Sequence, residues 1–141
     1  MAIFNGLFQQ LAAAPTVQTA LGAAAAKTAI FFGAASKEPP ARFIVINRID
    51  APPAGQTLDG PSDLIDAELQ FDAYAENQLA AHALARAVRD LLKGYGGSLP
   101  DGTTIQFTEI TGDRDAGYEV GAEGYVFRAL LRMRAMYTEA A

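Results

Sequence analysis

The sequence contains no cysteine and no tryptophan, and it has a single histidine among its 141 residues. Without cysteine, thiol catalysis, cysteine-ligated zinc or iron–sulfur sites and a disulfide framework are all excluded. Charged residues are scarce at 19% of the chain, and 16 acidic against 11 basic side chains give a formal charge of -5. This excess of acid argues against a surface that attracts nucleic-acid phosphates. Hydrophobic residues make up 50% of the chain, and at this length they indicate one globular domain, residues 1–141, with its own core.

Signals for membrane insertion and export are also missing. The most apolar stretch, residues 11–36, is built largely from alanine and is interrupted by Pro15, Gln18 and Lys27. Because such a segment would be poorly stabilised in a bilayer, we expect no transmembrane helix and no membrane partner. The first residues lack the basic cluster that precedes a secretory hydrophobic region. The sequence therefore predicts a protein that stays inside the producing cell.

Apolar spacing predicts two helices near the N-terminus. The first follows five apolar residues at offsets of three and four, namely Ile3, Phe4, Leu7, Phe8 and Leu11. Pro15 suits the first turn of a second, short helix with Val17 and Leu21 on one side, and Gly22 marks its end.

Runs of β-branched, aromatic or alternating residues predict strands over residues 28–32, 43–50, 68–75 and 104–110. The stretch 51–62 is rich in proline and glycine, so we expect a long excursion there rather than a tight turn. Residues 112–124 are rich in glycine and acid and predict a loop. Over residues 125–137 one parity is apolar and the other carries arginines, which favours a long strand, although good helix formers leave a helix open.

A principal helix is predicted over residues 77–93, with Asn77 at the N-cap. Its expected apolar stripe consists of Ala80, Ala83, Leu84, Ala87, Val88 and Leu91. Together these elements predict an α+β fold. We expect a mixed, mainly antiparallel sheet of about five strands packed against this helix and the N-terminal one.

No residue set has the pattern of a catalytic or metal centre. His82 lies on the polar face of the principal helix without a serine nucleophile nearby in the sequence, so we interpret it as a solvated side chain. The acids Asp59, Asp63 and Asp66 lack the spacing of an EF-hand loop and its closing glutamate. We therefore expect no catalytic residue, no metal and no cofactor.

Two sets of charged side chains remain to be explained. The acidic set alternates along the polar face of the strand at 68–75 and contains Glu68 and Asp72, with Gln70 between them. The basic set lies in the C-terminal strand and contains Arg128, Arg132 and Arg134. Because oppositely charged strands can set register within or between molecules, we interpret the arginines as surface or intersubunit partners of the acidic set.

The order helix, strand, strand, long loop, strand, helix, strand, strand resembles the tail terminator, or tail completion, proteins of long-tailed bacteriophages. The likeness is carried by residues 29–33 and 43–46 around Pro39-Pro40, by residues 69–75 with the helix that follows, and by residues 124–128. The sequence departs from the usual pattern in its alanine-rich stretch after Gly22 and in the long connection at 112–124.

This resemblance implies a structural virion protein and not an enzyme. Six copies would form a ring that caps the tail tube, stops tube polymerisation and joins tail to head, in a phage or in a gene transfer agent. The partners would be other copies of the chain, the tail tube protein and a head-side connector or stopper protein. Assembly would take place in the host cytoplasm, and DNA would pass through the lumen without specific binding.

The resemblance also suggests roles for particular residues. An acidic lumen would not retain DNA, so we expect channel-facing acids among Asp59, Asp63, Asp66, Glu68 and Asp72. We expect contacts with a neighbouring subunit from Arg128, Arg132 and Arg134. Prolines lower the entropy lost on contact, so the candidates for docking onto the tube are Pro52, Pro53, Gln56 and Leu58. The alternatives are a head-completion or neck protein of the same junction and a small α/β ligand-binding module or enzyme, which would need a deep pocket with convergent polar groups.

Overall fold

A computed structural model describes residues 2–22, 29–36, 39–50, 56–57, 60–61, 64–121 and 124–138. The helices in these ranges are α1 (Ala2–Ala13), α2 (Pro15–Leu21) and α3 (Gln78–Leu92). The strands are β1 (Ile30–Phe32), β2 (Phe43–Asp50), β3 (Gln56–Thr57), β4 (Gly60–Pro61), β5 (Ile65–Ala75), β6 (Gly97–Ser98), β7 (Thr104–Gly121) and β8 (Gly124–Thr138). None of the helices in the described ranges is long and apolar enough to cross a membrane.

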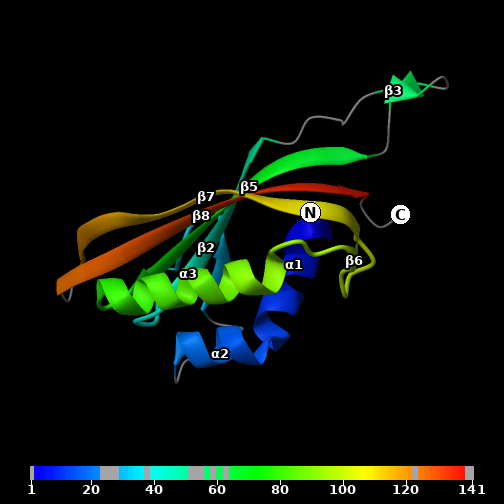
Figure 1. The fold of residues 1–141 in the computed structure, drawn as a ribbon. Coiled ribbons are helices and arrows are strands. Elements are labelled where there is room, and N and C mark those ends of the chain that lie inside the picture. Colours follow the sequence, from blue (N-terminus) through cyan, green and yellow to red (C-terminus); the bar gives the residue numbers. More distant parts are fainter. Residues whose placement is uncertain are drawn as a thin grey trace.

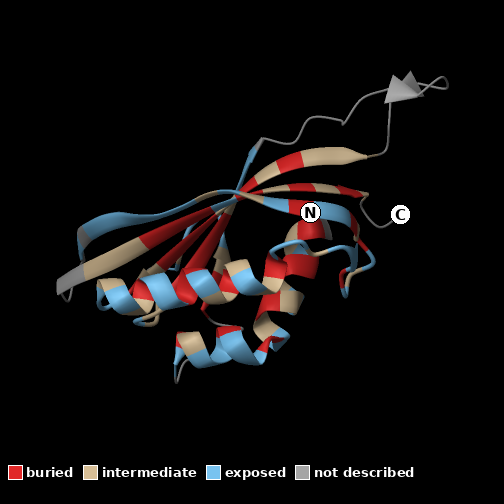
Figure 2. Ribbon diagram, in the orientation of Figure 1, coloured by how far each residue is buried: buried red, intermediate tan, exposed pale blue. Residues whose placement is uncertain are grey.

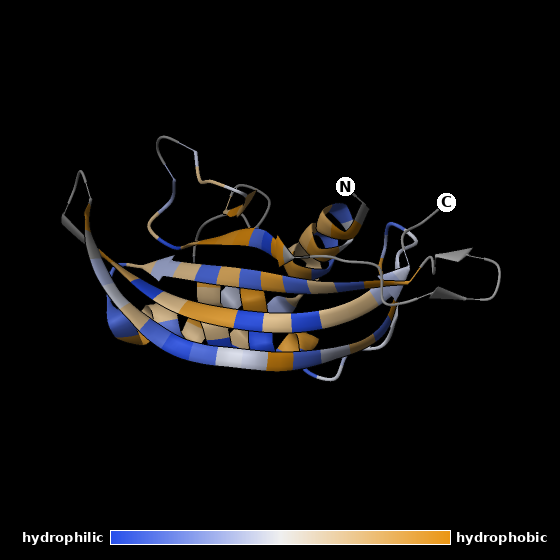
Figure 3. Ribbon diagram, turned by 90° about the horizontal axis from the view of Figure 1, so that it is seen from above, coloured by the Kyte–Doolittle hydropathy of each residue, from blue (hydrophilic) through white to orange (hydrophobic). Residues whose placement is uncertain are grey.

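Six strands form one sheet in the order β1-β2-β5-β8-β7-β6, and β3 and β4 pair with each other in a separate small sheet. β1 runs parallel to β2, and every other pair in the main sheet is antiparallel. The helices pack on one face of this sheet, and no helix of the described part covers the opposite face (Figures 1 and 3). The α+β class and the mixed, mainly antiparallel sheet predicted from the sequence are confirmed.

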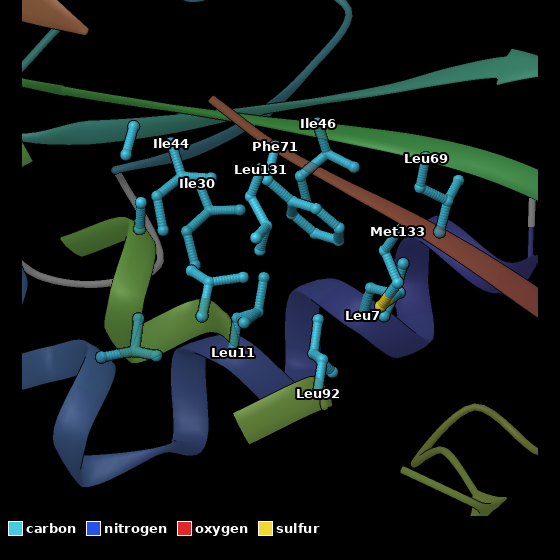
Figure 4. Packing of buried hydrophobic residues seen from close by; sticks show 14 of the residues in the cluster. Leu7, Leu11, Ile30, Ile44, Ile46, Leu69, Phe71, Leu92, Leu131 and Met133 are labelled. Atoms are coloured by element: carbon cyan, nitrogen blue, oxygen red, sulfur yellow. The ribbon is translucent and has the colours of Figure 1, made fainter. Parts of the chain in front are cut away.

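The hydrophobic core fills the space between the sheet and the helices (Figure 2). Alternate residues of the central strands point into it, because successive side chains of a strand face opposite sides. Phe71 of β5 and Leu131 of β8 are neighbours in register, and both are buried. They meet Leu7 and Leu11 of α1 and Leu92 of α3 in one continuous cluster (Figure 4).

The two N-terminal helices form as predicted. The buried side of α1 consists of Ile3, Leu7 and Leu11, which are fully enclosed. Pro15 occupies the first turn of α2, where its missing N–H removes no hydrogen bond, and Gly22 ends the helix with a φ of 79°.

The principal helix is capped as predicted, and most of its predicted stripe packs against the core. The Asn77 side chain accepts a 2.8 Å hydrogen bond from the backbone N–H of Ala80. The buried residues of α3 are Ala81, Leu84, Ala85, Val88 and Leu92. The other predicted residues Ala80, Ala87 and Leu91 are partly buried against the core. The prediction was wrong at Ala83, which is exposed, because a small alanine side chain does not by itself mark the buried face.

The predicted loop at residues 112–124 was wrong in most of its length. β7 continues to Gly121 and stays paired with β8, with Gly112 opposite Arg132 and Tyr118 opposite Phe127. Irregularities after Ile110 and after Asp115 interrupt the register, and Gly117, with a φ of 78°, lies within the second one. The long β8 provides a template along which a glycine-rich partner strand can extend. The strand interpretation of residues 125–137 is confirmed, and the helical alternative is wrong.

Candidate interaction surface

The register of β5 and β8 places the acidic and the basic side chains on the same face of the sheet. Glu68 lies opposite Arg134, and Gln70 lies opposite Arg132. Direct cross-strand partners share a face, and the intervening pair of Leu69 with Met133 is buried towards the helices. The charged residues therefore project from the face that the helices leave uncovered (Figure 3). We call this surface the charged face, and its members on β5 and β8 are Asp66, Glu68, Gln70, Asp72, Arg128, Arg132 and Arg134.

Each arginine of β8 pairs with an acid that is two residues away from its direct register partner on β5. The Arg134–Asp66 distance is 2.7 Å, the Arg128–Asp72 distance is 3.3 Å, and the Arg132–Glu68 distance is 3.9 Å. All three pairs are displaced in the same direction along the strands. Diagonal neighbours in an antiparallel sheet are within reach of long side chains, so the three pairs form one slanted ladder.

Arg134 makes the closest contact of the ladder. Its Nε and Nη2 donate two hydrogen bonds, of 2.8 and 2.7 Å, to the two carboxylate oxygens of Asp66. These hydrogen bonds hold the pKa of Asp66 below its ordinary value and raise the pKa of Arg134. The guanidinium also lies 5.6 Å from the ring centre of Phe107 and 3.9 Å from Glu109, both on β7. Arg134 thus connects three strands on the charged face.

Asp72 is the most enclosed acid of the ladder, with only 8% of its side chain exposed. Its direct register partners are Val45 on β2 and Leu130 on β8, which are both buried. Gln70 donates hydrogen bonds of 3.1 and 3.2 Å to its two oxygens, and Arg128 supplies a positive charge. Because a carboxylate among apolar neighbours is costly unless it is paired, the position of Asp72 depends on these partners.

The charged face extends onto β7. Besides the three arginine–acid pairs it includes Glu109, opposite Arg134, and Arg114, opposite Leu130, both on β7.

On the face of the sheet that carries the helices, polar side chains connect β7 to α3. Arg89 donates a 2.8 Å hydrogen bond to Asp113, and His82 Nδ1 lies 3.3 Å from Asp115. His82 is exposed, as predicted. In the part of the chain that the structure describes, no group of three or more His, Cys, Asp or Glu side chains could hold a metal ion.

The candidate residues predicted from the sequence fall into three groups. Asp66, Glu68 and Asp72 lie beside the three arginines on one surface, so the predicted channel residues and the predicted subunit-contact residues are partners within one chain. Asp59 and Asp63 lie outside the described residues, as do Pro52, Pro53 and Leu58. Gln56 belongs to β3, which pairs with β4.

Sequence reasoning missed the contribution of β7 to the charged face. Phe107 and Glu109 both contact Arg134. The alternation of residues 104–110 placed them on a strand, but which strand lies beside β7 could not be read from that alternation.

Comparisons with known proteins agree with the architecture. The family model described as tail completion protein gp17 matches residues 5–138. A chain from a solved structure of the virion of a native gene transfer agent particle has the same fold, with a TM-score of 0.67 at 19% sequence identity. The match covers 99% of this chain and 96% of that chain. No curated protein matches the sequence significantly.

Proposed function

Because the chain belongs to the tail completion protein gp17 family and is therefore a structural protein of a phage-type tail and virion, we propose that its copies form a ring at the end of the tail tube. Six copies close this ring, stop further polymerisation of the tube and provide the surface that joins tail to head. The observation that carries the proposal is the family match across residues 5–138, which begins in the first turn of α1 and spans the other two helices and every strand of the main sheet.

Tail length tests this role directly. Particles should be prepared from cells that lack the protein and imaged by electron microscopy. A terminator that is missing leaves overlong tubes, whereas a missing neck protein leaves tails of normal length without heads. Overlong tubes are expected here. Normal tails without heads would favour the head-completion role and overturn the capping role.

The charged face is our candidate for the surface along the DNA path. Every basic contact to phosphate adds salt-dependent affinity, so unpaired arginines would hold DNA that has to move. Each of the three arginines on β8 has a carboxylate partner within 4 Å on β5. Asp66, Glu68 and Asp72 therefore act by engaging the arginines. The alternative role of the arginines, contact with a neighbouring subunit, would have to be made by groups that are already paired.

Charge reversal on this face tests the DNA path. Glu68→Lys removes the partner of Arg132 and adds a cation at a side chain that is 39% exposed. Asp72→Lys removes the acid beside Arg128 and adds a cation at an enclosed position. Both variants should slow DNA ejection from assembled particles or leave DNA bound, and added salt should relieve the defect. The matched control is Asp90→Lys, an exposed reversal on α3. Normal ejection from particles that contain the Glu68→Lys chain would reject the assignment.

The segment around β3 and β4 is our candidate for docking onto the tube. Gln56 and Thr57 pair with Pro61 and Gly60 to form a small sheet separate from the main one. Deleting residues 51–62 should abolish capping while leaving rings intact. Rings that still stop tube growth would place the docking surface elsewhere.

A further inference from the structure

The two edges of the main sheet differ in what they expose. β1 forms one edge, with only three residues. At the other edge β6 pairs with Thr104 and Ile105 alone. The rest of β7 has no further strand beside it among the described residues. A long uncovered edge strand is a ready template for contact with another chain.

The β1 edge carries an aromatic cluster. The ring of Phe32 packs against Phe4 at 4.9 Å and Phe8 at 6.1 Å, both on α1, and Phe32 itself is exposed. We call these three residues the α1–β1 patch. The helix that carries Phe4 and Phe8 is uncharged, because residues 2–22 contain no acidic or basic side chain. Aromatic enrichment together with depletion of charge is typical of the core of a protein–protein interface.

The opposite edge exposes a second apolar group near the end of β7. Tyr118 is 61% exposed and Val120 is 78% exposed, and they share one side of the strand. Leu79, in the first turn of α3, is 80% exposed. It precedes His82 by about one helical turn, and His82 contacts Asp115 of β7, so Leu79 projects at the same end of the sheet. We call these three residues the β7 patch.

Two acids near the β7 patch are engaged within the chain. Asp113 is bound by Arg89, and Asp115 lies beside His82. Charges that already have partners are not buried as unpaired ions when their surface docks on an uncharged one. Helix α1, which carries Phe4 and Phe8, has no charged residue.

We propose that the α1–β1 patch of one copy receives the β7 patch of the next copy. The inference rests on the proposed ring, because a closed ring of identical subunits is built from a heterologous contact between two different surfaces. The two patches lie on opposite edges of one sheet and differ in shape and residue type, so each copy can give one and receive the other. Contact between like patches would leave one apolar surface of every chain exposed.

Introduced cysteines test this contact cleanly because the chain has none of its own. Asn5→Cys places a thiol at an exposed position of α1 next to Phe4, and Val120→Cys places one in the β7 patch. Each variant should be assembled into particles and also purified, and then treated with a short bismaleimide. The matched control is Asp90→Cys, an exposed position on α3 that belongs to neither patch.

A chain that carries both Asn5→Cys and Val120→Cys should give a ladder of covalent oligomers. A mixture of the two single variants should stop at dimers, and each single variant alone should remain monomeric, as should Asp90→Cys combined with Asn5→Cys. Dimers from Val120→Cys alone would show an isologous contact and overturn the inference. Rings seen by electron microscopy in which the double variant gives no ladder would also overturn it, while leaving the proposed ring in place. Absence of rings in wild-type particles would instead refute the proposed function.

Discussion

Replacing Asp72 by asparagine should destabilise the fold more than any other single neutralisation on the charged face. Asparagine keeps the shape and can still accept a hydrogen bond from Gln70, so the change isolates the charge opposite Arg128. Breaking a fully buried ion pair costs about 3–5 kcal/mol. The Arg128 side chain is 27% exposed, so water replaces part of the lost interaction. We expect a cost of about 1–3 kcal/mol, which is typical when one partner of a buried polar interaction is removed.

The matched control is Glu68→Gln on the same strand and the same face. The side chain of Glu68 is 39% exposed, and its oxygen is 3.9 Å from Arg132, so its neutralisation should cost no more than about 0.5 kcal/mol. Urea unfolding followed by circular dichroism measures both values, with the slope checked for constancy. Equal losses for the two variants would refute the argument from burial.

A double-mutant cycle sharpens the test. Asp72 lies in register between Val45 and Leu130, which are both buried and apolar. Replacing Asp72 and Arg128 together by leucine should therefore bring stability back to within about 1 kcal/mol of wild type, whereas each single replacement removes one charge of the pair and leaves the other in place. A double variant as unstable as the sum of the two single variants would show that the charges act independently.

Three further predictions concern the ladder and the helices. The hydrogen bonds from Arg134 lower the pKa of Asp66 in the folded state, so the stability that they contribute is complete above the ordinary carboxyl pKa and is lost as the pH falls through the lowered value. In the Asp66→Asn variant the free energy of unfolding, measured by urea titrations at acid pH, should therefore fall less steeply with decreasing pH. Asn77→Ala should lower the free energy of unfolding by about 1 kcal/mol, and Asn77→Asp should not, because only the first removes the N-cap acceptor. Gly6→Ala should destabilise α1 although alanine is the better helix former, because the added Cβ would lie 2.8 Å from the Cβ of Leu99; a rise in melting temperature would contradict this.

Local patterns predicted most elements of the fold because each pattern reports a local cause. The cap at Asn77 and the helix end at Gly22 depend on residues within one turn. The exact buried residues of α3 and the length of β7 depend on what lies beside these elements. Alanines at the margin of the helix's apolar side are buried or exposed according to their neighbours, and a stretch with glycine and acid becomes a strand only where β8 provides a partner.

The candidate surface was harder to predict because it depends on register. Alternation correctly placed Glu68 and Asp72 on one side of a strand and the arginines on one side of another. Whether these two sides coincide is decided by the pairing of β5 with β8, and a shift by one residue would have turned the arginines towards the helices. From the sequence alone, the acids were therefore assigned to the channel and the arginines to a subunit contact, although the two sets are partners on one face.

The separation of charge and apolar surface constrains how copies of this chain can associate. If the charged face lay between subunits, the ionised side chains of that face would leave water, and their desolvation would have to be matched by new partners. Contact through the edges of the sheet requires less desolvation of charge. The exposed groups there include Phe32, Tyr118 and Val120, and the acids Asp113 and Asp115 have partners in the same chain. Contact through the edges leaves the charged face free. A ring built in this way keeps its paired arginines available to water and to whatever moves past them.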